Sequence, residues 1–458
     1  MSIRTTGRLV LATATSVALA GGLLTLSAGS VTAATQAKYA DDYNGDGFRD
    51  YAFGDGGDSV TVTYGTATGP GTKTKRFTQN SAGIPGTSGD AGGYADGFGG
   101  SLANADLNRD GYADLVVGDR SEKVGGKVAA GAVTVLWGAK AGLGAKATRI
   151  PVAANAYYGF GTALATGDFN GDGKPDLAVA DGVGTVYIYR GGIGPAGTTG
   201  RVTKHDHRDL GETTALVAGR VTKDNATDLY VLGQGYKGDK ATQAAWFLRG
   251  GATITSGRLT TYNNAQPDYG PTGVIADFDK NGYGDLAVSD VPHSKSAGSV
   301  VILRGSATGP VSTYSRLTQA TSGVATNPTQ GDAFGYSLSA GDTNRDGYPD
   351  LAVSASSEKV GSVANAGGVH VLRGSRNGLT GAGSKWFTRA TAGVPGNAGQ
   401  YQMFGLGVRL RDIDRDGDAD LLISGQNGSG NVLLRSAGAS GVTVGAASEV
   451  GVRAEFPQ

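Results

Sequence analysis

The sequence of 458 residues predicts an all-β protein, a seven-bladed β-propeller, and three observations lead to this fold class. An acidic nine-residue motif, Asp-x-Asx-x-Asx-Gly-x-x-Asp, recurs along the chain in steps of 52 to 70 residues. Short apolar runs separated by turns accompany each copy, and the chain holds 80 glycines. The 40 acidic residues include only five Glu, and Asp favours turns whereas surface helices favour Glu.

The N-terminal segment, residues 1–33, has the pattern of a secretory signal peptide. Arg4 and Arg8 precede a run of apolar and small residues, and small residues end at Ala33. The alternative is a membrane anchor, but the run is short and is broken by two glycines. We therefore expect residues 34–458 to form a single secreted propeller without a membrane span.

The repeat unit behind the motif has four apolar runs. A Phe-Gly element such as Phe98-Gly99 precedes the motif, a β-branched run such as 114–117 follows it, and two further runs complete the unit. Four short strands with glycine-rich turns predict one antiparallel sheet, and seven such sheets can bury their faces by radial packing. An open solenoid is the alternative; the lack of linkers rich in Pro or charge favours a closed ring. How the ring closes stays open, because the first repeat begins almost at its motif.

The motif predicts calcium-binding β-hairpin loops. Calcium prefers six to eight oxygen ligands, and side chains at positions one, three and five of a tight loop converge on one point, with Gly at position six permitting the turn. The position-seven carbonyl and the position-nine Asp complete the expected ligand set. Six copies qualify, with these ligands: Asp42, Asn44, Asp46, Phe48, Asp50; Asp106, Asn108, Asp110, Tyr112, Asp114; Asp168, Asn170, Asp172, Lys174, Asp176; Asp277, Asp279, Asn281, Tyr283, Asp285; Asp342, Asn344, Asp346, Tyr348, Asp350; Asp412, Asp414, Asp416, Asp418, Asp420.

Other readings of the motif fit less well. An EF-hand needs Glu at position twelve and flanking helices, whereas Val117 occupies that position in the second copy. A turn without metal would leave several carboxylates to repel one another. Magnesium demands stricter octahedral geometry than such a loop offers, so calcium is favoured.

The fourth copy, residues 220–228, departs from the motif. Arg220 replaces the first Asp, Thr222 the third residue, and Asn225 the glycine, whereas Asp224 and Asp228 remain. We expect no calcium here, and the hypothesis is that the Arg220 guanidinium replaces the ion by pairing with both carboxylates.

With its Phe-Gly element and acidic loop, the chain resembles the FG-GAP repeat family, the seven-bladed propellers of integrin α-subunit heads and of secreted bacterial proteins. The resemblance covers residues 38–436, although the Gly-Ala-Pro element is mostly lost, as at 118–120. It implies calcium, an extracellular location and the binding of protein or matrix, without a shared ligand.

The amino-acid composition excludes several kinds of site and partner. The chain has no Cys, which excludes thiolate metal sites and a cysteine nucleophile, and it has four His. Its formal net charge of zero argues against nucleic acid as a partner. The His205–His207 cluster is expected in a surface loop. The three tryptophans are expected to pack rather than to stack on sugars.

We therefore predict a secreted module, monomeric and extracellular or wall-associated, that binds a protein, wall polymer or glycan and does not catalyse a reaction. Long connections at 79–97, 319–332 and 391–402 are expected to gather on one face and to carry the binding. The alternative is a secreted hydrolase or lyase acting on a polysaccharide or lipid-linked substrate, although no acid–base pair stands out.

Overall fold

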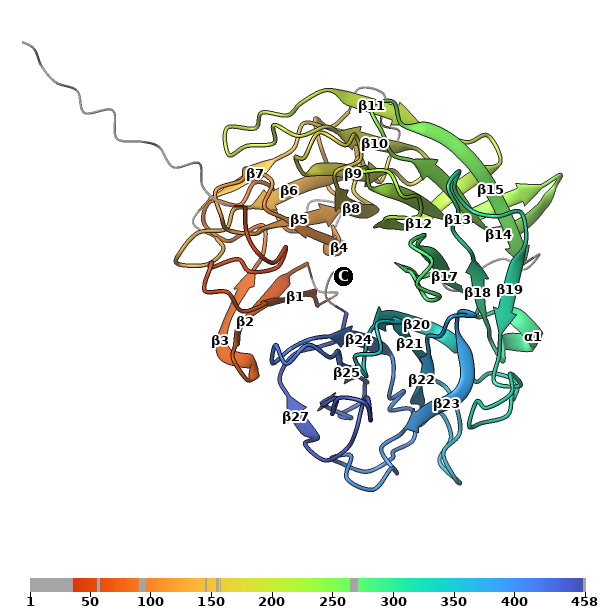
Figure 1. Cartoon of the computed structure of the whole chain (residues 1–458). Coiled ribbons are helices and arrows are strands. Elements are labelled where there is room, and N and C mark those ends of the chain that lie inside the picture. The colour runs from red at the N-terminus through yellow and green to blue at the C-terminus, as the bar shows by residue number, and fades with distance from the viewer. Residues whose placement is uncertain are drawn as a thin grey trace, which may run out of the picture. The chain divides into compact units, whose positions relative to one another are not determined.

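The structure, a computed structural model, describes residues 36–55, 58–89, 96–144, 146–153, 156, 158–263 and 271–455. The predicted signal segment 1–33 lies outside the described residues. Seven antiparallel sheets follow one another around a ring, so the predicted all-β, seven-bladed propeller is confirmed (Figure 1).

Each sheet is a meander in which consecutive strands pair. The bounds of the strands, blade by blade, are β1 (Tyr51–Gly54), β2 (Val60–Thr66), β3 (Gly69–Phe77); β4 (Phe98–Ala105), β5 (Asp114–Asp119), β6 (Ala132–Leu136), β7 (Ala147–Arg149); β8 (Ala163–Gly167), β9 (Asp176–Ala180), β10 (Val186–Tyr189), β11 (Val202–His205); β12 (Leu210–Gly219), β13 (Asp228–Lys237), β14 (Lys240–Arg249), β15 (Thr255–Asn263); β16 (Gly273–Ala276), β17 (Asp285–Ser289), β18 (Val300–Leu303), β19 (Tyr314–Leu317); β20 (Phe334–Gly341), β21 (Asp350–Ala355), β22 (Gly368–Arg373), β23 (Thr380–Phe387); β24 (Gly407–Arg411), β25 (Asp420–Ser424), β26 (Asn431–Leu434), β27 (Ser448–Val450).

One short helix, α1 (His293–Ser296), lies between β17 and β18. Among the described residues, no helix has the length and apolar character needed to cross a bilayer.

The second and third strands of a blade are buried on both sides, which explains their continuous apolar runs. Side chains alternate between the two neighbours of the blade. In β5, Val116 packs with Leu177 of blade 3, whereas Leu115 and Val117 pack with Val62 of blade 1. Burial of both sheet faces between neighbouring blades therefore holds the ring together.

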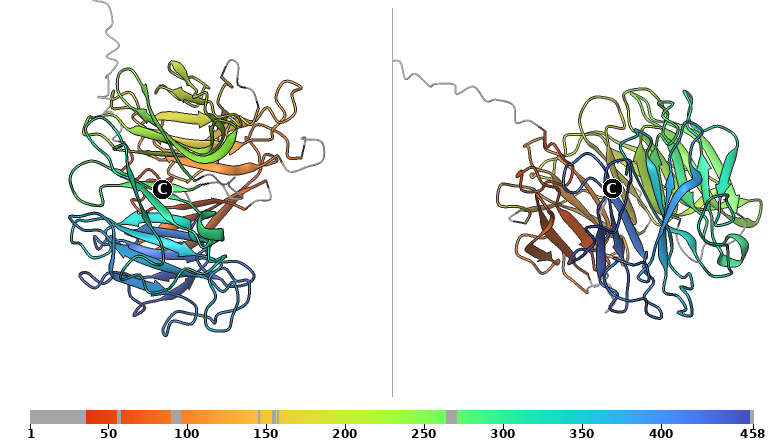
Figure 2. Two further views of the ribbon diagram at one scale, coloured as in Figure 1. Left: turned by 90° about the vertical axis from the view of Figure 1, so that its right-hand side faces the viewer. Right: turned by 60° about the horizontal axis from the view of Figure 1, so that its bottom comes forward.

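The first strands of blades 2 to 7 surround a central cavity of about 1000 Å³. Seen from other directions, the strands run between two faces of the ring (Figure 2). We call the face that carries the connections between first and second strands the loop face. Because strands alternate in direction, the hairpins between second and third strands lie on the opposite face, as do the connections from one blade to the next.

Ring closure uses the C-terminal segment. Blade 1 has three described strands, which correspond to the second, third and fourth strands of the other blades. No innermost strand is present among its described residues. Val452 and Ala454 are fully buried in a cluster with Tyr51 of blade 1 and Leu422 of blade 7. Ala454 also lines the central cavity, as the first strands of the other blades do. The C-terminal segment thus occupies the junction that the missing strand would fill.

Candidate metal centres

Five of the six acidic loops that match the motif connect the first strand of a blade to the second, and the loop at 42–50 precedes β1 in the equivalent place, so all six share the loop face. The second loop shows the geometry they share. Asp106 accepts bonds from the N–H groups of Asp110 at 3.0 Å and Gly111 at 3.1 Å, and Asn108 also accepts from Asp110 at 3.0 Å. The Asp110 carboxylate accepts the N–H of Tyr112 at 3.0 Å. Positions one, three and five therefore fold back over their own loop.

Four further loops repeat this pattern. The bond from the position-six N–H to the position-one carboxylate recurs at Gly47, Gly173, Gly282 and Gly347, at 2.6 to 2.8 Å. The position-six glycine has a positive φ, for example 94° at Gly111, which a side chain rarely adopts. The sequence prediction that glycine permits this turn is confirmed.

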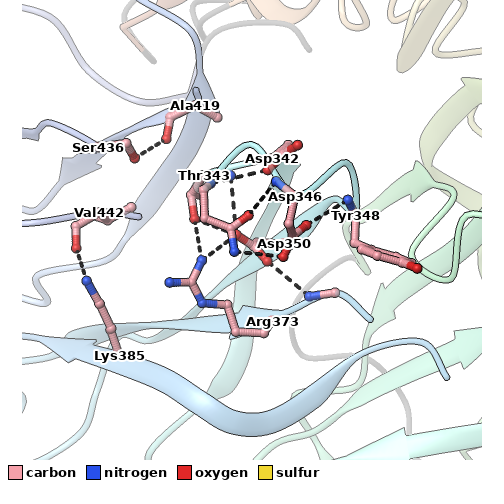
Figure 3. A network of polar contacts seen from close by, with 12 residues as sticks. Asp342, Thr343, Asp346, Tyr348, Asp350, Arg373, Lys385, Ala419, Ser436 and Val442 are labelled. Atoms are coloured by element: carbon pink, nitrogen blue, oxygen red, sulfur yellow. Dashed lines mark hydrogen bonds and ion pairs between the residues drawn. The ribbon is translucent and has the colours of Figure 1, made fainter. Parts of the chain in front are cut away.

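Loop 6, the sixth copy of the motif at residues 342–350, shows how the acidic turn is attached to its blade (Figure 3). The Arg373 guanidinium, from the end of β22, lies 3.0 Å from both the Thr343 hydroxyl and an Asp350 carboxylate oxygen. The second Asp350 oxygen accepts the N–H of Gly374 at 3.0 Å. Asp346 accepts the N–H of Tyr348 at 2.9 Å.

The position-nine aspartates have a second role besides their predicted ligation. All seven are buried; six of them begin the second strand of their blade, and Asp50 immediately precedes β1. In blade 2, one Asp114 oxygen accepts the N–H of Leu107 and the other that of Gly138, both at 2.9 Å. Burial raises the pKa of Asp50 and Asp114 to about 8. The carboxylate thus fastens the loop to the end of the third strand.

Loop 7, the seventh copy of the motif at residues 412–420, differs in having carboxylates at all of positions one, three and five. One oxygen each of Asp412, Asp414 and Asp416 lies within 4.8 Å of the others. The buried Oδ1 atoms of Asp412 and Asp418 have no hydrogen-bond partner. Calcium prefers oxygen ligands, and several carboxylate oxygens converge here, two of them without a hydrogen-bond partner. The ligand set is therefore chemically suited to the metal that the family resemblance implies.

The structure of the fourth copy contradicts the hypothesis that Arg220 pairs with Asp224 and Asp228. Arg220 is exposed and makes no ion pair among the described residues, so it does not replace a calcium ion. Arg249, from the end of β14, pairs with Asp224 at 3.1 Å instead. Asp228 accepts bonds from the N–H and hydroxyl of Thr222, at 2.7 and 2.9 Å. The position-nine contacts are therefore kept in the copy that we predict to bind no ion.

Successive loops touch one another around the loop face, which the sequence did not reveal. At six of the seven junctions between loops, a residue at position four of one loop contacts position seven of the next. These contacts are Gly45 with Tyr112, Gly171 with Ala226, Lys223 with the Tyr283 ring at 4.2 Å, Lys280 with the Tyr348 ring at 5.5 Å, Arg345 with Asp418 at 3.4 Å, and Arg415 with the Phe48 ring at 4.0 Å. The last contact joins blade 7 to blade 1.

Backbone hydrogen bonds follow the same path. The position-eight N–H donates to the position-one carbonyl of the preceding loop, at Ala113–Asp42, Thr227–Asp168, Gly284–Arg220 and Ala419–Asp342, over 2.7 to 2.9 Å. At two other junctions the position-eight residue is Pro175 or Pro349, which has no N–H to donate. Residues that carry the predicted ligands are thus fastened to the neighbouring loop.

The three long connections expected to bind join one blade to the next and so belong to the opposite face; residues 90–95 of the first connection lie outside the described residues. Two of them reach into the next blade: Gln79 donates to buried Glu122 at 2.6 Å, and Gln319 donates to Glu358 at 2.8 Å. Large apolar side chains are also exposed on this face, at the ends of hairpins and blade connections: Val128, Tyr158, Val183, Tyr236 and Tyr401.

The remaining candidates are placed as follows. Trp137 and Trp246 are buried, and Trp386 stacks on the buried His370 ring at 4.1 Å, so the expected packing role is confirmed. The expectation of a surface loop for the histidine cluster is only partly right: His205 ends strand β11, and the His207 ring contacts Trp246 at 5.6 Å.

Comparison with known proteins supports the resemblance. The FG-GAP repeat profile matches residues 334–372, and the FG-GAP-like repeat profile matches 106–179 and 168–231. The chain is 41% identical to mouse (Mus musculus) integrin alpha-7 over 104 residues, which are 21% of this chain and 8% of that protein.

Two further relatives show the same partial similarity. The chain is 40% identical to chicken (Gallus gallus) integrin alpha-6 over 109 residues, 22% of this chain and 10% of the relative. It is 34% identical to bovine (Bos taurus) phosphatidylinositol-glycan-specific phospholipase D over 154 residues, 29% of this chain and 18% of the relative. The chain spans less than a fifth of the length of these curated relatives.

Proposed function

Because the chain belongs to the FG-GAP repeat family of integrin-α-like β-propellers, we propose that it is a secreted calcium-binding module that adheres to an extracellular protein, wall polymer or glycan. Calcium holds the loop face in place, and the opposite face makes the contact. The chain acts as a monomer outside the cell, where it associates with the cell surface or wall.

The observation that carries the binding role is the exposed apolar set on the opposite face. Tyr401 is 53% exposed, Tyr158 44% and Tyr236 43%, and Val128 at 63% and Val183 at 36% accompany them. Tyrosine is enriched in binding interfaces because its ring offers large contact area with a polar tip. Several such rings around one face of a rigid ring support a partner-binding surface.

The calcium role is supported by the donor chemistry of six loops, with loop 7 as the best-formed example. Extracellular calcium modules bind with dissociation constants of ~10⁻⁴–10⁻³ M. At ten times the dissociation constant one site stabilises the fold by about 1.4 kcal/mol, so six sites would contribute about 8 kcal/mol. Since the chain has no disulfide, the ions are its main cross-links.

A pull-down tests the adhesion role. The full chain is immobilised in millimolar calcium, exposed to envelope extracts and polysaccharides, and eluted with chelator. We expect a partner that is retained in calcium, released by chelator and lost in the triple variant Tyr158→Ala, Tyr236→Ala, Tyr401→Ala. Tyr314→Ala is the matched control, because this tyrosine is 41% exposed but lies outside the opposite face. Equal retention by triple variant and control would reject the surface.

The second candidate is a hydrolase or lyase acting on a polysaccharide or lipid-linked substrate. The similarity to phosphatidylinositol-glycan-specific phospholipase D over 29% of this chain is the observation that supports this candidate. Release of reducing sugar, fatty acid or inositol phosphate from envelope fractions by the folded chain would establish turnover and displace the binding role as the main function.

A further inference from the structure

The outer edge of blade 3 gathers positive charge that the proposed adhesion surface does not use. β11 is the outermost strand of this blade (Figure 1) and pairs with β10. Beyond the pair Tyr189–Val202, the ladder continues through the bond from the Arg190 N–H to the Arg201 carbonyl at 3.0 Å. Arg190 and Arg201 therefore stand opposite each other, a like-charge pair that is unfavourable in a sheet.

These cations border a cavity between blades 3 and 4. The cavity has a volume of about 440 Å³ and is lined by the segment from Arg201 to His205, by Arg190, and by residues 252–254 of the β14–β15 connection. No carboxylate is among these lining residues, which include two arginines, a lysine and a histidine. A polar cavity of one charge sign suits a ligand of the opposite sign.

The two arginines lack counter-charges in the described part of the chain. Arg190 donates from Nη1 to the Ala252 carbonyl at 3.1 Å, and its buried Nε has no acceptor. Neither Arg190 nor Arg201 forms an ion pair among the described residues. Lys204 has only Asp206 at 3.9 Å, with both side chains at least half exposed. A buried donor without an acceptor costs free energy, and an anion in the cavity would remove that cost.

We propose that this cavity binds a tetrahedral oxyanion, a phosphoryl or sulfuryl ester group. Guanidinium groups suit such groups because they offer forked, charge-assisted hydrogen bonds. The ester group lies between Arg190 and Arg201. The site shares no lining residue with the acidic loops or with the proposed adhesion surface, so it goes beyond the proposed function.

Isothermal titration calorimetry of the full chain tests the site. The probes are glucose 6-phosphate, glucose 6-sulfate and neutral glucose, in low salt with millimolar calcium. We expect saturable binding of at least one ester and none of glucose. Binding of the phosphate alone or of the sulfate alone identifies the source of the oxyanion, and saturable binding of neither overturns the proposal.

Variants locate the binding. We expect Arg190→Gln and Arg201→Gln each to weaken ester binding by about tenfold or more, the loss of one charge-assisted hydrogen bond. The matched control is Arg208→Gln, which removes the same charge from a side chain that is 91% exposed and pairs with Asp209. Because Arg201 is exposed, its variant remains informative if Arg190→Gln does not fold. Equal weakening by Arg208→Gln, or none by Arg201→Gln, would refute the site.

Discussion

The position-nine aspartate of the fourth repeat offers a sharp test of how the acidic loops are held. Asp228 is fully buried in the blade whose loop we predict to bind no ion. Its Oδ2 accepts the N–H groups of Val221 at 3.1 Å and Thr222 at 2.7 Å, together with the Thr222 hydroxyl at 2.9 Å. Its Oδ1 accepts the N–H of Gly250 at 2.9 Å. The Asp228→Ala variant removes all four acceptor contacts.

The expected loss follows from those contacts. A buried N–H without an acceptor costs about 1–3 kcal/mol, so three of them sum to at least about 3 kcal/mol. Burial raises the pKa of Asp228, which shows that the buried charge carries a desolvation cost. The Ala variant no longer has this cost, so the upper limit of the expected loss in unfolding free energy is lower. We therefore expect Asp228→Ala to lower the free energy of unfolding by about 3–5 kcal/mol.

Urea unfolding followed by tryptophan fluorescence measures this loss, since Trp246 is buried in the same blade. The loss should be equal in calcium and in chelator, because no ion is expected in this loop. Asp114→Ala, in a loop predicted to bind calcium, should lose about 1.4 kcal/mol more in calcium at ten times the dissociation constant. Asp224→Ala is the control, because its partly exposed pair with Arg249 contributes within about 1 kcal/mol. A loss below about 1 kcal/mol for Asp228→Ala, or one seen only in calcium, would refute the fastening role.

Three further outcomes are expected. Chelation should lower the melting temperature by many degrees, since six sites contribute about 8 kcal/mol; superimposed melts in calcium and chelator would contradict the calcium role. Burial and the Glu122 carboxylate raise the pKa of Asp119 to about 8, so the folded state holds a proton that the unfolded state releases near pH 4. The free energy of unfolding should therefore fall as pH rises from about 4 to 8, and Asp119→Asn should remove up to about 1.4 kcal/mol of that fall per pH unit. Parallel profiles of unfolding free energy against pH for the wild type and the variant would contradict this. Val452→Asp should destabilise the ring by several kcal/mol because it buries an unpaired charge, whereas Val128→Asp, at a 63% exposed position, should change unfolding by less than about 0.5 kcal/mol.

The sequence by itself determined the blades and the acidic turns. Both depend on contacts between residues close in the chain, such as the Gly111 N–H and the Asp106 carboxylate five residues earlier. Strand identity followed from runs such as 114–117, and turn geometry from the position-six glycine, because each is set by local sterics and alternation.

The tertiary structure decided what residues distant in the chain do to one another. It showed that Arg249, and not Arg220, pairs with Asp224, because the third strand of the blade returns beside the loop 25 residues later. It placed Val452 against Tyr51 and thereby closed the ring. It also brought the cations at 190 and 201–205 to a cavity wall supplied by blade 4. Such pairings follow from strand register and from the packing of one blade on the next, which no local pattern of residues specifies.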